Sequence, residues 1–159
     1  MRDIYVVGDA NVDIIVPYPR FLNEERTLVD YPNPELVGGG TSANTAVALA
    51  KLGLPVSFLG TIGDDQYGKY IQKDFKEQGV NTADLIVDPK LNTVGVFAFI
   101  DENGERYLWG WPRVDQAFKV LERDKVPFEK IEAADWVHSS GMSLVYDTSA
   151  RTEIIEIFK

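Results

Sequence analysis

Two short clusters of polar residues carry the side chains that could do chemistry in this chain. The first follows an apolar run near the N-terminus and contains Asn11 and Asp13. The second is a run of three glycines at positions 38–40, with Asn44 four residues beyond it. A carboxylate accepts two hydroxyl protons, and a carboxamide both donates and accepts. These side chains therefore suit a ligand that presents both hydrogen-bond donors and acceptors.

The glycine run is the strongest local signal in the sequence. Without a Cβ atom, Gly39 and Gly40 would let the backbone lie against a ligand. The helix predicted to follow offers unpaired N–H groups in its first turn, which Thr41 or Ser42 is expected to cap. A tight turn between a strand and a helix would by itself explain one or two of the glycines.

The same run also fits the G-x-G-x-x-A fingerprint of dinucleotide-binding oxidoreductases, through Gly38, Gly40 and Ala43. That fingerprint must follow directly on a regular buried strand. Here Pro32 and Pro34 precede it. A dinucleotide-binding oxidoreductase is therefore the least favoured alternative.

Around these clusters, apolar strands alternate with helices, which is typical of parallel βαβ units in an α/β fold. The predicted strands are 4–7, 56–59 and 136–140, and the predicted helices are 41–53, 68–78 and a helix from Thr148 that still runs at Lys159. The polar segment 115–125 is expected to form a short amphipathic helix.

Further strands are expected to form a small second sheet near residues 12–37 and 92–112. Asn103-Gly104, between the runs 94–100 and 106–111, predicts a hairpin. The run 14–16 is limited by Pro17 and Pro19 to an edge or irregular strand, and 28–37 looks solvent-facing.

Three motifs in order resemble the ribokinase family, also called the PfkB carbohydrate kinases. They are Val7-Gly8-Asp9-Ala10-Asn11-Val12-Asp13, then Gly39-Gly40-Thr41-Ser42-Ala43-Asn44 with Leu52-Gly53 and Gly60-Thr61-Ile62-Gly63-Asp64, and finally Ala134-Asp135-Trp136-Val137-His138-Ser139-Ser140-Gly141. The resemblance implies a ribokinase-like α/β fold, a parallel sheet flanked by helices with a small β-sheet lid. Residues 1–159 would form its N-terminal part, without the C-terminal half.

What the resemblance implies about function is an ATP-dependent carbohydrate kinase with Mg²⁺. Its sugar-binding residues would be Asn11, Asp13, Gly39, Gly40 and Asn44. The family's catalytic Asp and nucleotide pocket belong to a C-terminal glycine-rich loop. We therefore expect no catalytic residue in this chain, no full ATP or metal site, and no phosphoryl transfer by it alone.

The sequence leaves two questions open: which substrate the kinase would bind, and whether the chain is instead a stand-alone module. Thr41 and Ser42 stand where ribokinase itself has Lys and Gly, which disfavours ribose and leaves fructose, a keto-acid sugar or a nucleoside. A sugar-binding or regulatory module that never had a catalytic half is the second hypothesis. The sequence following Lys159 in the gene would separate it from the first.

Three aromatic and basic residues lie where the predicted hairpin returns toward the core. Arg113 could bind a carboxylate or phosphate through two hydrogen bonds, and Trp109 and Trp111 could stack on a sugar. Alternatively, both tryptophans are hydrophobic packing and Arg113 is solvated. His138, in a predicted buried strand, is interpreted as structural.

The composition of the chain indicates which classes of binding partner are disfavoured. With 25 acidic and 16 basic residues its net charge is −9, which disfavours nucleic acid and anionic membranes. It has no cysteine, and no apolar stretch approaches the ~18 residues of a membrane span. We expect a cytoplasmic protein. A homodimer could form through lid strands, with Val96 and Phe97 at an open edge, or through an exposed edge of the main sheet.

Overall fold

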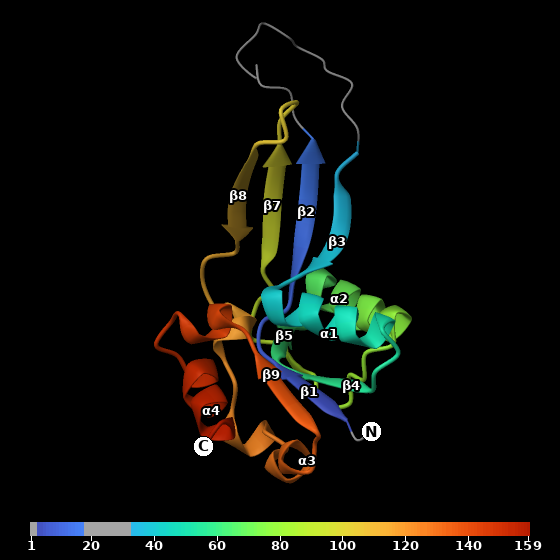
Figure 1. Cartoon of the computed structure of the whole chain (residues 1–159). Helices are drawn as coiled ribbons and strands as arrows, with labels where there is room; N and C mark the ends of the chain where they lie inside the picture. The colour runs from blue at the N-terminus through green and yellow to red at the C-terminus, as the bar shows by residue number, and fades with distance from the viewer. Residues whose placement is uncertain (1–2, 18–32) are drawn as a thin grey trace, which may run out of the picture.

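The computed structural model describes residues 3–17 and 33–159 and shows an α/β layer from which a second sheet projects (Figure 1). The α/β layer is built on three parallel strands in the order β4-β1-β9. Their bounds are Ile4–Val7 (β1), Val56–Leu59 (β4) and Trp136–Ser139 (β9). The central strand β1 pairs in parallel with both neighbours. The parallel sheet predicted from the sequence is confirmed.

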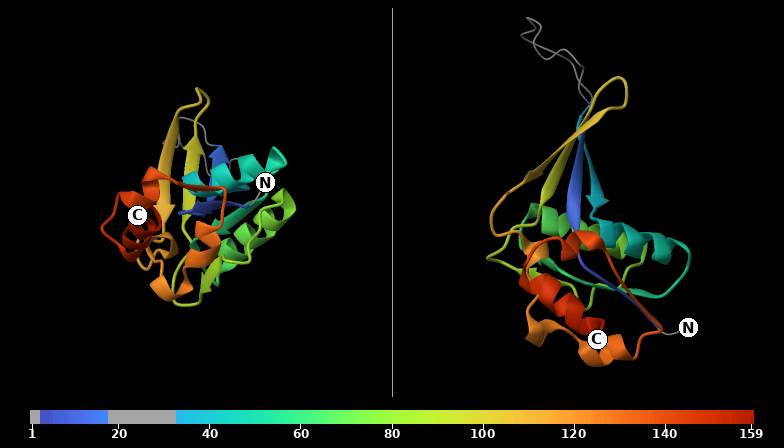
Figure 2. Two further views of the ribbon diagram at one scale, coloured as in Figure 1. Left: turned by 60° about the horizontal axis from the view of Figure 1, so that its bottom comes forward. Right: turned by 60° about the vertical axis from the view of Figure 1, so that its left-hand side comes forward.

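Helices cover both faces of this sheet (Figure 2). On one face lie α1 (Thr41–Lys51) and α2 (Gln66–Gln78), packed in a core that includes Val6. The other face is covered by α3 (Phe128–Glu132) and α4 (Ser149–Ile157), around Val7. A strand buried on both faces reads as a continuous apolar run, and this explains why β1 has no polar alternation.

Capping residues mark both ends of α2. Asp65 is the N-cap of α2 and accepts a hydrogen bond from the Gly68 N–H at 2.7 Å, while Gly79 closes the helix at φ 82°. The prediction that the last helix continues to Lys159 is wrong, because α4 ends at Ile157. No helix in the described ranges is long and apolar enough to cross a bilayer.

The projecting sheet, which we call the lid, has the strand order β3-β2-β7-β8. Its strands are Asn11–Pro17 (β2), Glu35–Gly39 (β3), Gly95–Ile100 (β7) and Arg106–Trp111 (β8). β2 runs antiparallel to β3 and parallel to β7. Residues 28–32 of the second predicted segment lie outside the described residues.

Two expectations about edges of the lid are wrong. β2 is an interior strand, because Pro17 is its last residue and interrupts none of the pairs before it. β7, which carries Val96 and Phe97, also lies inside the sheet, between β2 and β8. The glycine run ends β3, an antiparallel lid strand, so it lacks the parallel-strand context that a dinucleotide fingerprint needs.

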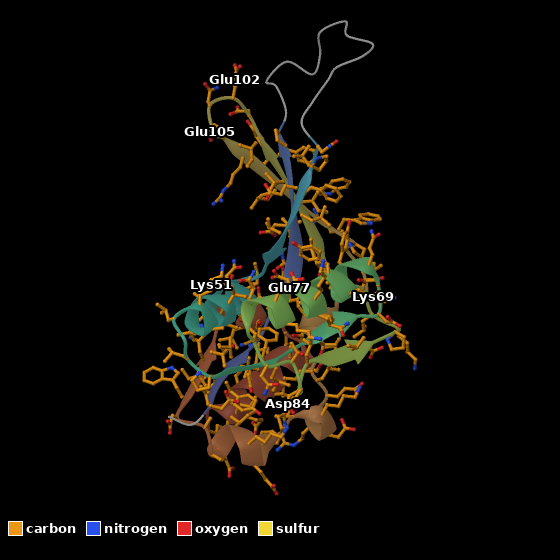
Figure 3. All side chains as sticks on the ribbon, turned by 90° about the vertical axis from the view of Figure 1, so that its right-hand side faces the viewer. Lys51, Lys69, Glu77, Asp84, Glu102 and Glu105 are labelled. Atoms are coloured by element: carbon orange, nitrogen blue, oxygen red, sulfur yellow. The ribbon has the colours of Figure 1, made fainter. Side chains whose placement is uncertain are left out.

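A five-residue turn closes the predicted hairpin at the free end of the lid. The Asp101 carboxylate accepts hydrogen bonds from the backbone N–H groups of Asn103 and Glu105, at 2.9 and 3.0 Å, and Gly104 adopts φ 80°. Figure 3 shows Glu102 and Glu105 at this end, far from Lys51 on α1.

The segment 115–125 is not the helix predicted for it. It forms two single 3-10 turns, at Ala117–Lys119 and Arg123–Lys125. Its backbone bonds neighbouring segments instead: the Ala117 N–H donates to the Asn92 carbonyl at 2.9 Å, and the Leu121 N–H to Ser149 Oγ at 3.2 Å. A short parallel pair, β5 (Thr61–Gly63) with β6 (Ile86–Asp88), completes the fold.

Candidate functional site

A cavity of about 420 Å³ lies where the lid meets the carboxyl ends of β1 and β9. We call it the lid cavity. Five residues proposed from the sequence line it: Asn11, Asp13, Gly40, Asn44 and Arg113. Strand alternation explains part of this convergence, because Asn11 and Asp13 are two residues apart on β2 and share a face with Val96 of β7, the register partner of Asp13.

Gly39 is the one proposed residue that lies elsewhere. It lines a neighbouring cavity of about 430 Å³ between β3, α1 and α2, which Asn11 and Asn44 also border. A Cβ atom at Gly39 would lie 2.5 Å from Asp13 Oδ1. The direction that a side chain of Gly39 would take is thus filled by the Asp13 carboxylate. That the Gly39 backbone lies against a ligand stays a prediction.

Gly40 is required for a different reason. It has φ 101°, a conformation that favours glycine, and a Cβ there would lie 2.8 Å from the Asp9 carbonyl oxygen. The glycine run therefore serves first to pack against the chain that follows β1.

Asp13 is a half-buried carboxylate at the lid cavity. Its Oδ1 accepts a hydrogen bond from Asn11 Nδ2 at 2.9 Å. Burial raises the pKa of the Asp13 carboxyl above its ordinary value of 3.8, while the Asn11 hydrogen bond and the positive charge of Arg106 act in the opposite direction. Asn11 therefore orients an acceptor whose charged form is costly to bury.

Asp9 is the residue that sequence reasoning missed. It is 4% exposed, and its Oδ2 accepts the Thr41 N–H at 2.7 Å. Its Oδ1 accepts from the Ser42 N–H at 3.2 Å, from Ser42 Oγ at 2.9 Å and from Ser140 Oγ at 2.8 Å. One carboxylate thereby joins the ends of β1 and β9 to the N-terminus of α1.

This network corrects the predicted cap of α1. Neither Thr41 nor Ser42 caps the helix, since the N-cap position is Gly40 and has no side chain. Asp9 supplies the acceptor from another strand, and its negative charge complements the positive end of the helix. One feature of the sequence could have indicated this role of Asp9. It is an acidic residue directly after a buried strand, and in parallel α/β units the N-termini of the helices lie at that edge of the sheet.

Arg113 is placed at the lid cavity by a loop that follows β8. A cis peptide joins Trp111 to Pro112 just before it. Gln116 Nε2 donates to the Pro112 carbonyl at 2.8 Å, and Asn92 holds the other side by donating from its N–H to the Asp115 carbonyl at 2.7 Å. The loop carrying Arg113 is thus fastened on both sides of that residue.

The two lid tryptophans lie on the face opposite the lid cavity. Leu108 and Gly110 of β8 line the cavity, so the alternating residues Trp109 and Trp111 point away from it. The Trp109 ring lies 5.7 Å from Phe97 and 6.1 Å from Trp111 between centroids. Stacking on a ligand in this cavity therefore does not describe them. They pack against each other and Phe97, but Trp109 stays 48% and Trp111 52% exposed.

Asp64, Asp65 and His138 lie outside the lid cavity. Asp64 forms an ion pair with Lys69 at 3.3 Å, and Asp65 caps α2. His138 lies half-buried in β9, an edge strand of the described sheet rather than a fully buried one. Among residues 3–17 and 33–159, no three His, Cys, Asp or Glu side chains are grouped to hold a metal ion.

These features define an α/β protein whose second β-sheet, the lid, borders a cavity lined by both polar and apolar residues. Comparison with known proteins gives the family: residues 1–159 match the pfkB family carbohydrate kinase. A fructokinase of Vibrio alginolyticus is 34% identical over 161 residues, covering 100% of this chain and 47% of its own length. A 5-dehydro-2-deoxygluconokinase of Bacillus subtilis is 38% identical over 149 residues, covering 92% and 44%.

Solved structures agree on the fold. The fructokinase of Xylella fastidiosa with bound ATP superposes with a TM-score of 0.81 at 23% identity, covering 98% of this chain and 48% of that one. The chain belongs to the pfkB family of carbohydrate kinases, and its fold is ribokinase-like. It spans about half the length of the curated relatives it matches.

Proposed function

We propose that this chain is the sugar-binding N-terminal portion of an ATP-dependent carbohydrate kinase, which phosphorylates a hydroxyl of a sugar or sugar-like substrate. The observation that carries the proposal is the convergence of Asn11, Asp13 and Asn44 on one cavity beneath the lid. A carboxylate and two carboxamides in one concave site match the alternating donors and acceptors of a polyol.

Each of these side chains has a distinct role in the proposed site. Asp13 accepts hydroxyl protons, and Asn11 holds it in position through the 2.9 Å hydrogen bond. Asn44, exposed on the first turn of α1, donates to and accepts from a further hydroxyl. The lid covers the substrate and excludes water, so that the phosphoryl group meets a sugar hydroxyl rather than solvent.

Phosphoryl transfer itself we assign to a part of the protein beyond Lys159. The reaction needs a base near the accepting hydroxyl and groups that stabilise charge on the phosphate, with Mg²⁺. Of the two carboxylates at the lid cavity, Asp9 is occupied by backbone and serine donors. We therefore propose that ATP and Mg²⁺ bind mainly outside this chain, and that the 159 residues alone bind sugar without phosphorylating it.

The test is ATP consumption by the full-length protein against pentoses, hexoses, keto-deoxy acids and nucleosides. The names of the relatives place fructose and 5-dehydro-2-deoxygluconate among the first to try. Asp13→Ala is expected to abolish turnover, while Asp74→Ala, an acidic residue of the neighbouring cavity, should preserve it. Absence of turnover with every class would refute the proposal.

A homodimer through the lid is a further part of the proposal. On the lid face opposite the cavity, Trp109 is 48% and Trp111 52% exposed, and they form one aromatic surface with Phe97. Exposed aromatic surface of this kind favours association. The second candidate surface is the free edge of β9, where Trp136 is 65% exposed.

A further inference from the structure

The cavity of about 430 Å³ between β3, α1 and α2 has no role in the proposed function, and we call it the helix cavity. Figure 1 shows the two helices side by side below β3. Ligand sites in proteins typically have about 300–1,000 Å³, so a small molecule fits this space. The side chains around it indicate which kind of molecule it suits.

The first glycine of the run brings a carboxylate to the wall of the helix cavity. A Cβ atom at Gly38 would lie 2.5 Å from Asp74 Oδ2. Glycine therefore lets the Asp74 carboxylate lie against the β3 backbone, just as Gly39 accommodates Asp13. The other oxygen, Asp74 Oδ1, accepts a hydrogen bond from Gln78 Nε2 at 3.3 Å. The backbone on one side and the amide on the other thus position this carboxylate.

The half-buried Asp74 carboxylate has no positively charged partner among the residues that the structure describes. On the same helix, by contrast, Lys73 pairs with Glu77 at 3.8 Å. Lys51 also lines the cavity, but it is the last residue of α1, at the end of the helix remote from β3. A partly desolvated carboxylate without a cation is available to a positively charged ligand.

The surroundings of Tyr70, which lines the same cavity, are negative. Its hydroxyl donates to the Leu36 carbonyl at 2.8 Å, which places the phenol beside β3. Burial raises the pKa of Tyr70 above its ordinary value. Nearby carboxylates raise this pKa further because they oppose a second negative charge, and they belong to Asp74, Glu77 and Glu35. A cation is favoured here both by these charges and by the face of the aromatic ring.

Apolar side chains form the floor of the helix cavity. Ala43 of α1 and Ile71 and Phe75 of α2 line it, and they are 3%, 2% and 2% exposed. A hydrocarbon chain placed on this floor is removed from water, which favours its binding. The cavity therefore combines a negative end at β3 with an apolar floor.

We infer that the helix cavity binds a small organic ammonium compound, whose charged group lies at Asp74 and whose apolar chain lies on the floor. Inorganic cations prefer several oxygen ligands and would leave the apolar floor unused. An anion would be repelled by the carboxylates at the β3 end. This site is additional to the proposed sugar site and adjacent to it, because Asn11 and Asn44 border both cavities.

Calorimetry of the full-length protein with n-butylammonium chloride tests the inference, and n-butanol serves as the uncharged probe with the same hydrocarbon chain. Sodium chloride at about 0.15 M screens non-specific attraction to the acidic surface. We expect n-butylammonium to bind with a dissociation constant of about 1 mM. The alcohol should bind at least about 10-fold more weakly, because it cannot form a charge-assisted hydrogen bond to Asp74.

Two variants and one control assign the site. Asp74→Asn keeps the size of the side chain, removes its charge and should weaken n-butylammonium binding by about 10- to 100-fold. Gly38→Ala should also weaken it, because the new Cβ displaces the Asp74 carboxylate. Glu77→Gln is the charge-matched control: Glu77 lies on the same helix, is 61% exposed and does not line the cavity. It should change affinity by less than about 2-fold.

The outcomes that would refute the ammonium site are separate from those that would refute the kinase. Equal affinities for n-butylammonium and n-butanol, or equal effects of Asp74→Asn and Glu77→Gln, would refute it. Absence of binding at about 10 mM would also refute it, because a site with the expected dissociation constant is then about nine-tenths occupied. Sugar phosphorylation is measured without the amine, so either proposal can fail alone.

Discussion

Replacing Asp9 by alanine tests whether one buried carboxylate holds the candidate site together. The substitution removes the acceptor of the Thr41 and Ser42 N–H groups and of two hydroxyls, those of Ser42 and Ser140. Ser42 is 0% and Ser140 6% exposed, so water cannot readily replace the lost partner. The N-terminus of α1 also loses its only side-chain acceptor among the described residues.

The expected decrease in the free energy of unfolding follows from these lost hydrogen bonds. Loss of an N-cap acceptor costs about 1 kcal/mol, and leaving buried polar groups without a partner costs about 1–3 kcal/mol. Ser42 Oγ and Ser140 Oγ lie 2.9 Å apart, so without Asp9 one of these hydroxyls can donate to the other, which limits the second loss. We expect Asp9→Ala to lower the free energy of unfolding by about 3 kcal/mol, a large fraction of the 5–15 kcal/mol typical of a domain.

Urea unfolding followed by circular dichroism measures this change, and calorimetry measures sugar affinity in the folded protein. Asp65→Ala is the matched control, because Asp65 also caps a helix and accepts the Gly68 and Thr93 N–H groups, both at 2.7 Å, away from the lid cavity. It should cost about 1–2 kcal/mol and leave affinity unchanged. A loss below 1 kcal/mol for Asp9→Ala, or equal effects of both variants on affinity, would refute the reasoning.

Three further predictions concern the same site and the lid. The pKa of Asp13 is raised, so the protonated form of its carboxyl group is favoured in the folded state. The stability that this protonation contributes is present at low pH and is lost as pH rises through the raised pKa. Sugar affinity should increase over the same pH interval, and it should stay flat in Asp13→Asn. Gly39→Ala places a Cβ 2.5 Å from Asp13 Oδ1 and should weaken sugar binding about 10-fold by calorimetry, whereas Gly141→Ala meets no atom within 4 Å and should not. Trp109→Ser should weaken a lid dimer in sedimentation equilibrium about 10-fold, and a larger effect of Trp136→Ser would assign the interface to β9 instead.

The elements that the sequence predicted correctly are those whose signals are local. Ile4–Val7 and Val56–Leu59 are short apolar runs bounded by turns, and each is a strand at those bounds. The helix Gln66–Gln78 is closed by Gly79 in the left-handed conformation, as its position predicted. Periodicity and turn chemistry suffice where neighbouring residues decide the structure.

The predictions that were wrong concern elements whose structure depends on contacts with segments far away in the sequence. The polar pattern of 115–125 permits a helix, but Asn92 and Ser149 take its backbone donors, and 3-10 turns result. The interior position of β2 depends on pairing with β7, some eighty residues later in the chain, which no local pattern reveals. Pro17 was a correct boundary signal, yet it marks the end of the strand and not the edge of the sheet.

For the candidate site, residue type predicted which side chains converge but not what each contacts. Asn11, Asp13 and Asn44 were selected through the family resemblance and Arg113 because it can bind an anion, and all four line one cavity. The contacts of Asp9 could not be predicted in the same way, because its partners Ser42 and Ser140 are 33 and 131 residues away. Hydrogen bonds of that sequence separation are set by the tertiary fold alone.

Asp9 and Asp13 illustrate how the fold gives two carboxylates of one short segment different tasks. Asp9 is 4% exposed and its oxygens are used by N–H and hydroxyl donors, whereas Asp13 is half-buried and borders the lid cavity. The glycine run separates them: Gly40 packs on the Asp9 backbone and Gly39 on the Asp13 carboxylate. We therefore expect the glycines to influence ligand binding through the aspartates that they accommodate. A substitution in the run should change affinity by moving Asp13 even where it touches no ligand atom.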